Sequence, residues 1–341
     1  MKKRTLFIEL SIVVLLLYLT AGFAADKKLA QTGFQFLSIT TDARASAMGS
    51  AFTAVPGKSS SIFFNPANMA SISSFVDLSL SQNNWIADIN HYAGSLAISP
   101  KGGHYGVIAL SVMSVDYGEF LGTVVDATSE KGFRDTGSFA PTAYAFGIGY
   151  ARALTDRFSV GGHVRYVSQK LGNSILPADD FSSSGLTKEV DNRVEVMAFD
   201  FGTIYRTGFK SLVFGMSVRN FSQEVKYQTE GFQLPLTFNI GISMNVFDLF
   251  MEETDLHSLM VSIDALHPRA YSERINIGTE YWFKNMFALR CGYKNNYDER
   301  GLTAGFGFQL NLGKRNLAVD YSYTPFGVFD MVQRMSFRLS M

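Results

Sequence analysis

The stretch GLTAGFGFQLNL, residues Gly301–Leu312, decides the fold class because its side chains alternate in character. Apolar residues take the even positions, and Gly, Thr, Gln and Asn take the odd ones. Successive side chains of a strand point to opposite faces, so the stretch predicts a strand with one apolar and one polar face. The same pattern recurs in 212–219, 234–246, 274–281 and 334–341, where the given sequence ends.

Two architectures produce such alternation: a soluble sandwich or barrel with a dry core, and a membrane barrel with an apolar outside. These stretches belong to periodic runs of about 10 to 14 residues, as 234–246 and 301–312 show in full. Such runs are near the roughly 9 to 11 residues that cross a bilayer and above the roughly 5 to 6 of strands in soluble domains. We therefore predict an all-β fold, a transmembrane antiparallel barrel of about 14 strands. Its predicted polar lumen residues are His163, Arg165, Asp264, Arg274, Glu280, Arg290 and Asp320.

The connections between the predicted strands support a membrane barrel. Long segments at 116–139, 171–192 and 221–232 alternate with tight turns such as 100–103 and 313–315. Long outer loops and short periplasmic turns are typical of outer-membrane barrels. Two local irregularities are expected: a bulge near Met197, where the apolar phase changes, and a short amphipathic helix over 247–256.

The N-terminal sequence predicts that the protein is exported. Lys2, Lys3 and Arg4 precede an apolar run at 6–19 and small residues at 21–25, which together are typical of a secretory signal peptide. The predicted organisation is a signal peptide at 1–24, a plug or hatch at 25–74 and the barrel at 75–341. The predicted location is the outer membrane of a diderm bacterium, with lipid around the wall, and the zero net charge gives no indication of nucleic acid as a partner.

Residues 25–74 do not alternate, and their aromatic and small apolar side chains require cover. A barrel wider than about eight strands has a lumen that its own wall cannot fill. We therefore expect this segment to fold inside the barrel.

Two phrases in this segment, GFQFLSITTDARASAMGSAFTAV (33–55) and SSIFFNPANMA (60–70), resemble the opening of the PorV/PorQ family. That family belongs to the superfamily of the long-chain fatty-acid transporter FadL. The resemblance implies a lumenal hatch that includes Asp42, Arg44, Gly49, Asn65, Pro66 and Ala67. Their role is structural or gating: Pro66 fixes a bend, Gly49 permits close packing, and Asp42 and Arg44 pair with lumen charges such as Arg274, Arg290 or Glu280.

No catalytic motif is found in the sequence. The five His residues form no metal-ligand pattern, and the single Cys291 excludes a disulfide framework. We expect neither enzymatic activity nor a cofactor or metal.

Two functions remain open. In PorV-like proteins the resemblance implies type IX secretion, in which outer loops bind exported cargo or secretion-system proteins. The alternative is FadL-like uptake of a fatty acid or another hydrophobic small molecule. For either function, the outer-loop apolar contact residues are expected to be Phe120, Leu121, Val124, Val125, Ile175, Leu176 and Phe181.

Overall fold

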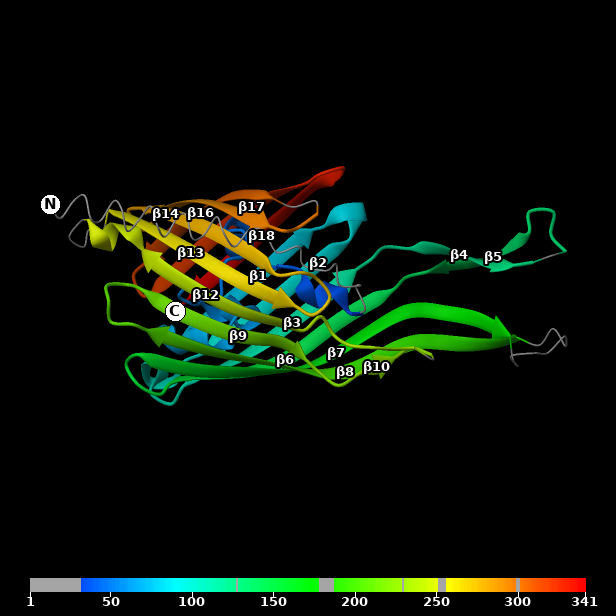
Figure 1. Cartoon of the computed structure of the whole chain (residues 1–341), viewed down its shortest axis with the longest axis horizontal. Coiled ribbons are helices and arrows are strands. Elements are labelled where there is room, and N and C mark those ends of the chain that lie inside the picture. Colours follow the sequence, from blue (N-terminus) through cyan, green and yellow to red (C-terminus); the bar gives the residue numbers. More distant parts are fainter. Residues whose placement is uncertain (1–31, 127, 178–186, 229, 251–255, 299–300) are drawn as a thin grey trace.

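The structure is a computed structural model that describes residues 32–126, 128–177, 187–228, 230–250, 256–298 and 301–341. Within these residues, fourteen strands close into one antiparallel barrel (Figure 1). The wall consists, in neighbour order, of β1 (Val76–Asn84), β18 (Phe329–Ser340), β17 (Arg315–Phe326), β16 (Leu302–Leu312), β15 (Phe287–Asn295), β14 (Arg274–Phe283), β13 (His257–Pro268), β12 (Thr237–Asn245), β9 (Val213–Phe221), β8 (Thr187–Arg206), β7 (Phe158–Pro177), β6 (Thr142–Ala153), β3 (Val107–Asp116) and β2 (Asn90–Ile98). The predicted fold class is confirmed.

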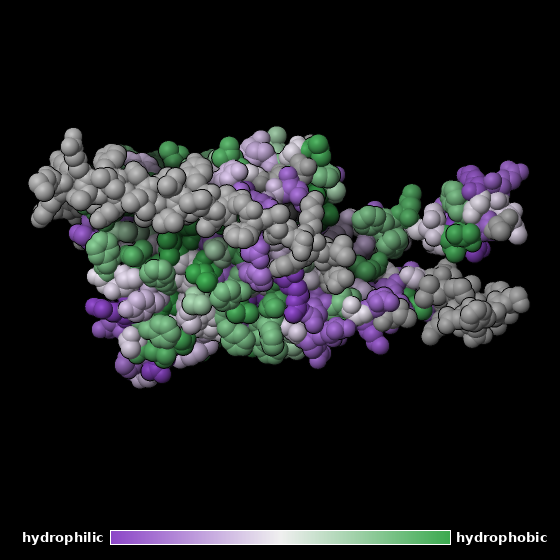
Figure 2. Space-filling view, viewed as in Figure 1, coloured by the Kyte–Doolittle hydropathy of each residue, from purple (hydrophilic) through white to green (hydrophobic). Residues whose placement is uncertain are grey.

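The two faces of the wall differ as the alternation predicts. In β3 the residues are buried and exposed in strict alternation. Outward residues such as Ile148, Leu289 and Phe306 are large, apolar and exposed, whereas Asp264 and Asp320 point inward and are buried. Figure 2 shows hydrophobic side chains over the barrel body and hydrophilic ones toward its ends. Among the described residues, no helix has the length and apolar character needed to cross a membrane.

A charge on the outward face tests this assignment. Phe306 is 56% exposed near the middle of β16, and a lysine at the bilayer midplane costs about 2–4 kcal/mol. Phe306→Lys is therefore expected to block formation of the heat-modifiable folded band in cold gel electrophoresis. In the control Gln309→Glu the carboxylate faces inward, where Gln309 Oε1 accepts a 3.2 Å hydrogen bond from Arg338. Equal tolerance of the two variants would mean that the faces are reversed.

Two structures project from one end of the barrel, which we call the outer end (Figure 1). The first is the hairpin of β4 (Phe120–Val125) and β5 (Phe133–Phe139), here named the β4–β5 arm. The second is the continuation of β7 and β8 beyond their barrel neighbours, paired as far as Pro177 and Thr187. A smaller pair, β10 (Val225–Lys226) and β11 (Gly231–Phe232), lies in another connection at the outer end.

The bulge expected near Met197 is displaced: β8 itself has none, and the irregularity begins two residues further on, opposite Phe199–Phe201, with the extra residue in β9. Val194, Val196 and Ala198 of β8 are buried in one unbroken phase. The register shift lies further along the chain, where β9 has one residue more than β8 and Asn220 adopts a φ of 60°. The apolar phase changes because the outer part of β8 turns its apolar side inward, onto the interior cluster that includes Val194 and Val196.

The helix expected over 247–256 appears only as the short 3-10 helix η7 (Val246–Leu249), while residues 251–255 lie outside the described part. Two further 3-10 helices, η5 (Ile86–Asp88) and η6 (Pro100–Gly103), lie in connections. β18 closes the wall against β1, and Val76 and Met341 exchange both backbone hydrogen bonds at 2.9 Å.

The segment before β1 fills the interior. We call residues 32–74 the hatch; it contains η2 (Gln35–Ser38), α2 (Ala43–Ala47), η3 (Ser59–Phe63) and η4 (Pro66–Ser71). α2 contacts β15 to β18, η3 contacts β1, β2 and β3, and η4 contacts β6, β7 and β8. Most hatch residues are buried, and Figure 1 shows the segment inside the wall. The predicted signal peptide and residues 25–31 lie outside the described residues.

Candidate functional site

A chain of buried ion pairs fixes the hatch to the wall. Arg44 on α2 donates to both oxygens of Glu280 at 2.7 and 2.6 Å. Glu280 also accepts from Arg290 Nε at 2.6 Å, and Arg290 Nη1 lies 2.8 Å from Asp320. Burial alone lowers the pKa of Arg44, but the neighbouring Glu280 carboxylate outweighs this and raises it. Arg44 therefore remains charged inside the lumen.

Asp42 plays a different part from its neighbour. Its carboxylate caps α2 by accepting a 2.8 Å hydrogen bond from the Ala45 N–H, as expected of an N-cap residue. Burial raises the pKa of this carboxyl, and the Ala45 N–H opposes the shift. Asp42 forms no ion pair with a wall residue within the described chain. Asp42 and Arg44 were both predicted to pair with lumen charges, and only Arg44 does so.

The Asn-Pro-Ala element forms the opposite anchor of the hatch. Asn65 Nδ2 donates to the carbonyls of Thr53 and Thr203 at 2.9 and 3.2 Å, and its Oδ1 accepts from the Ala67 N–H at 3.1 Å. Pro66 begins η4, where its missing N–H costs nothing.

Glycines let the hatch backbone touch the wall. Gly49 adopts a φ of 63° and donates to Thr303 Oγ1 at 3.0 Å. Across the lumen, a Cβ on Gly161 would lie 2.5 Å from the Ala67 nitrogen, a distance that real Cβ atoms do not adopt. All six predicted hatch residues thus lie inside the barrel in structural contacts.

His163 and Arg165 belong to a hydrogen-bonded row across four strands. Ser111 Oγ lies 2.8 Å from His163 Nε2, and His163 Nδ1 lies 3.0 Å from Asp200. Asp200 also binds Arg165 at 2.6 Å and the Asn220 N–H at 2.7 Å. The row has the order of a Ser-His-Asp triad, but its members are buried, and Ser111 does not line the cavity at the outer mouth. Arg165 already neutralises the Asp200 carboxylate, so the geometry favours a structural role in which the row links neighbouring strands.

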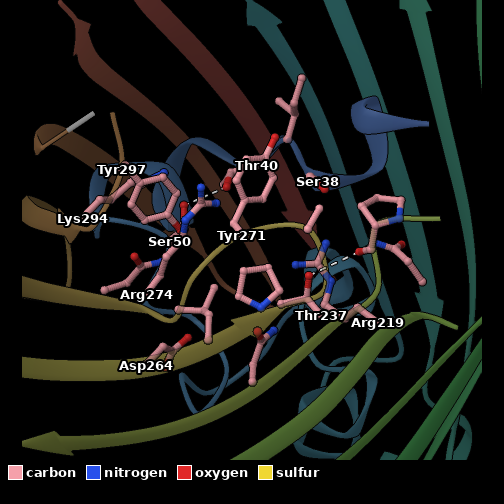
Figure 3. A pocket seen from close by; sticks show the side chains of 18 of the residues that line it. Ser38, Thr40, Ser50, Arg219, Thr237, Asp264, Tyr271, Arg274, Lys294 and Tyr297 are labelled. Atoms are coloured by element: carbon pink, nitrogen blue, oxygen red, sulfur yellow. Dashed lines mark hydrogen bonds between the residues drawn. The ribbon is translucent and has the colours of Figure 1, made fainter. Parts of the chain in front are cut away.

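The outer mouth of the barrel holds a cavity of about 450 Å³ between the hatch and the strands β9 and β12 to β15 (Figure 3). Two predicted lumen residues line it. Asp264 accepts from the Phe52 and Thr53 N–H groups at 2.8 and 2.9 Å, and Arg274 lies between the rings of two tyrosines at 4.2 and 4.0 Å. The cavity is also lined by Arg219, Asn239, Asn276, Lys294, Tyr271 and Tyr297, none of which was singled out from the sequence.

Four of the seven predicted outer-loop apolar contact residues lie on the β4–β5 arm. Leu121 and Val125 are 84% and 87% exposed, Phe120 is exposed, and Val124 is half-buried. Ile175 and Leu176 lie on the outer part of β7, where side chains are not described, and Phe181 lies outside the described residues.

A closed barrel with an apolar outer face and a lumen filled by its own N-terminal segment defines a plugged outer-membrane β-barrel protein. The family model described as "Type IX secretion system protein PorV" matches residues 23–268. The chain therefore belongs to the PorV family, and the resemblance expected from its opening motif is confirmed.

Solved structures share the fold at low sequence identity. The Ralstonia pickettii toluene transporter TbuX has a TM-score of 0.57 at 12% identity, with 87% of this chain and 97% of that chain covered. The Pseudomonas putida toluene transporter TodX gives 0.53 at 12%, with 87% and 96% covered. A Pseudomonas aeruginosa FadL homologue gives 0.50 at 13%, with 89% and 98% covered. No curated protein matches the chain in sequence.

The matched family and these structures are a secretion-system protein and transporters, not enzymes. Fold and family together place the chain in the outer membrane, as predicted.

Proposed function

We propose that this protein works without catalysis or cofactor in type IX secretion, and that its β4–β5 arm binds exported cargo or a secretion-system protein. The observation that carries this proposal is the exposure of apolar side chains on an arm beyond the barrel wall. Phe120, Leu121, Val125, Phe133 and Phe139 are all exposed there. Lipid covers outward apolar residues on the wall, but the arm projects past it, and exposed apolar groups in water mark protein interfaces.

The construction of the arm supports binding to a partner. A lone two-stranded hairpin is marginally stable in water, and every residue of β5 is exposed. The outer edges of β4 and β5 have no further strand beside them within the described sheet. A partner that adds a strand or covers these side chains would stabilise the arm as it binds.

The hatch supports secretion rather than uptake in this proposal. Its elements contact wall strands on opposite sides of the lumen, and the Arg44–Glu280 pair and the Asn65 hydrogen bonds fix it at two places. We infer that the six predicted hatch residues hold the plug, and that the inward charges of the wall receive it. The mouth cavity is lined by arginines and amides as well as by apolar side chains, so it is not the wholly apolar site that a hydrocarbon would favour.

The proposal is tested by a charge on the arm. Leu121→Asp combined with Val125→Asp should abolish co-purification of cargo or secretion-system proteins and should reduce cargo release at least about tenfold, since buried apolar anchors carry most interface energy. The protein should still fold, because neither side chain packs on the barrel.

The matched control is Val328→Asp, which alters a side chain of equal exposure, 86%, on the β17–β18 turn. It should leave co-purification unchanged. Intact partner binding by the double variant, or a bound fatty acid with no protein partner, would overturn the proposal.

A further inference from the structure

The mouth cavity contains buried polar atoms that the protein leaves without partners. Asp264 Oδ1, Asn239 Oδ1 and both amide atoms of Asn276 form no hydrogen bond within the described chain. The three residues are 2%, 4% and 0% exposed. A buried polar group without a hydrogen bond costs about 1–3 kcal/mol, and these groups line one cavity. Together the three residues form its floor. Three of these atoms, the Oδ1 atoms of Asp264, Asn239 and Asn276, are acceptors and require a ligand that donates hydrogen bonds, while Asn276 Nδ2 requires one acceptor.

Nearer the outer end, the cavity instead has hydrogen-bond donors that require an acceptor. Arg219 and Arg274 line the same cavity, and neither forms an ion pair with a carboxylate of the described chain. Arg219 Nε is buried without an acceptor. Arg274 is held flat between Tyr271 and Tyr297, and its Nε donates to the carbonyl of Asn296 at 3.3 Å. A stacked guanidinium presents its remaining N–H edge to a carboxylate.

The strand register gives the spacing between floor and rim. Asp264 pairs directly with Asn276, and Arg274 lies two residues further toward the outer end of β14. Two residues of strand correspond to about 7 Å. Figure 3 shows Arg274 and Arg219 on opposite sides of the pocket, with Asp264 on the side of Arg274. The cavity thus has a floor of one carboxylate and two amides, about two residues of extended chain below its outer rim. Lys294 starts opposite Asn276 but extends its ammonium to the Tyr297 ring at 5.6 Å, so the upper part includes the cations Arg219, Arg274 and Lys294, and one carboxylate, Asp298.

We propose that this cavity binds a short peptide of about two to three residues with both termini free. The terminal ammonium donates to Asp264 and the floor amides, and the terminal carboxylate accepts from Arg274 and Arg219. This inference goes beyond the proposed docking function and does not depend on it, because the site lies in the barrel mouth and not on the β4–β5 arm.

The test uses the full-length protein in detergent and titrates it with Ala-Ala-Ala, followed by Trp85 fluorescence and by calorimetry. Trp85 also lines the cavity. The acetylated peptide, the amidated peptide and free alanine should each bind at least about tenfold more weakly, the effect of losing about 1.4 kcal/mol.

Two variants test which part of the cavity binds each terminus of the peptide. Arg274→Gln should remove the preference for the free carboxylate and keep that for the free amine, whereas Asn276→Leu should weaken the preference for the amine. Arg193→Gln, on the exposed outer part of β8, should change neither. Leu121→Asp on the arm should leave peptide binding intact, which separates this proposal from the docking function.

Absence of Ala-Ala-Ala binding, equal binding of the acetylated peptide, or binding unaffected by both cavity variants would each overturn the proposal. Equal binding of the acetylated peptide would indicate a carboxylate site, as at the end of a protein partner.

Discussion

Replacing Glu280 by glutamine is expected to destabilise the folded protein by about 3–5 kcal/mol, the usual cost of removing one partner from a buried ion pair. Glu280 is fully buried and accepts from both Arg44 and Arg290. Glutamine keeps the shape of the side chain, but the guanidinium groups of Arg44 and Arg290 would then have only the Asp320 carboxylate to balance their two charges. The result should be a lower unfolding temperature of the heat-modifiable band and a hatch that proteases cleave near α2.

The control is Glu195→Gln. Glu195 and Arg193 form an exposed pair at 3.8 Å, and exposed pairs contribute about 0–1 kcal/mol. Similar small losses in both variants would show that the ion-pair chain does not hold the hatch.

Adding a side chain at Gly161 should displace the hatch from the opposite wall. The Cβ of Gly161→Val would lie 2.5 and 2.6 Å from backbone atoms of Ala67 and Pro66, which have no room to rotate away as a side chain would. We expect a loss of about 3 kcal/mol, the upper end of the range for overpacking. Ionic current through the lumen in planar bilayers should rise as the hatch leaves its seat.

The neighbouring glycine provides the matched control. A Cβ on Gly162 points to the other face of β7, and its nearest atoms lie 3.8 and 3.9 Å away. Gly162→Val should therefore keep both stability and low current. Equal behaviour of the two valine variants would contradict the contact between η4 and β7.

The barrel was predictable because its signal is local. Alternation in stretches such as 234–246 and 301–312 identifies both the strand and the face in contact with lipid, and the number of such stretches gives the fourteen strands. The lengths of the connections are also a local signal, and they predicted which end of the barrel is the outer end. The bulge was misplaced because apolar residues facing lipid and apolar residues facing the interior cluster look alike in sequence, as Met197 and Val196 show.

The partners of the inward charges were not predictable, because the alternation fixes a face but not which residues lie opposite one another. Ser111, His163 and Asp200 come together only through the register of β3, β6, β7 and β8. Asp200 and Asn220 carry no motif of their own. In the mouth cavity, Asn276 and Arg219 looked like ordinary polar positions, and their lack of partners appears only once the hatch is in place.

Partner binding by the β4–β5 arm is tested most directly by photo-cross-linking in intact cells from a benzoylphenylalanine placed at Leu121, which is 84% exposed on the arm. The same residue placed at Leu289, exposed on the lipid face of β15, serves as the reference. We expect a defined protein adduct, cargo or secretion-system component, from position 121 and none from position 289. Absence of a protein adduct from position 121, in cells that secrete cargo, would contradict partner binding by the arm.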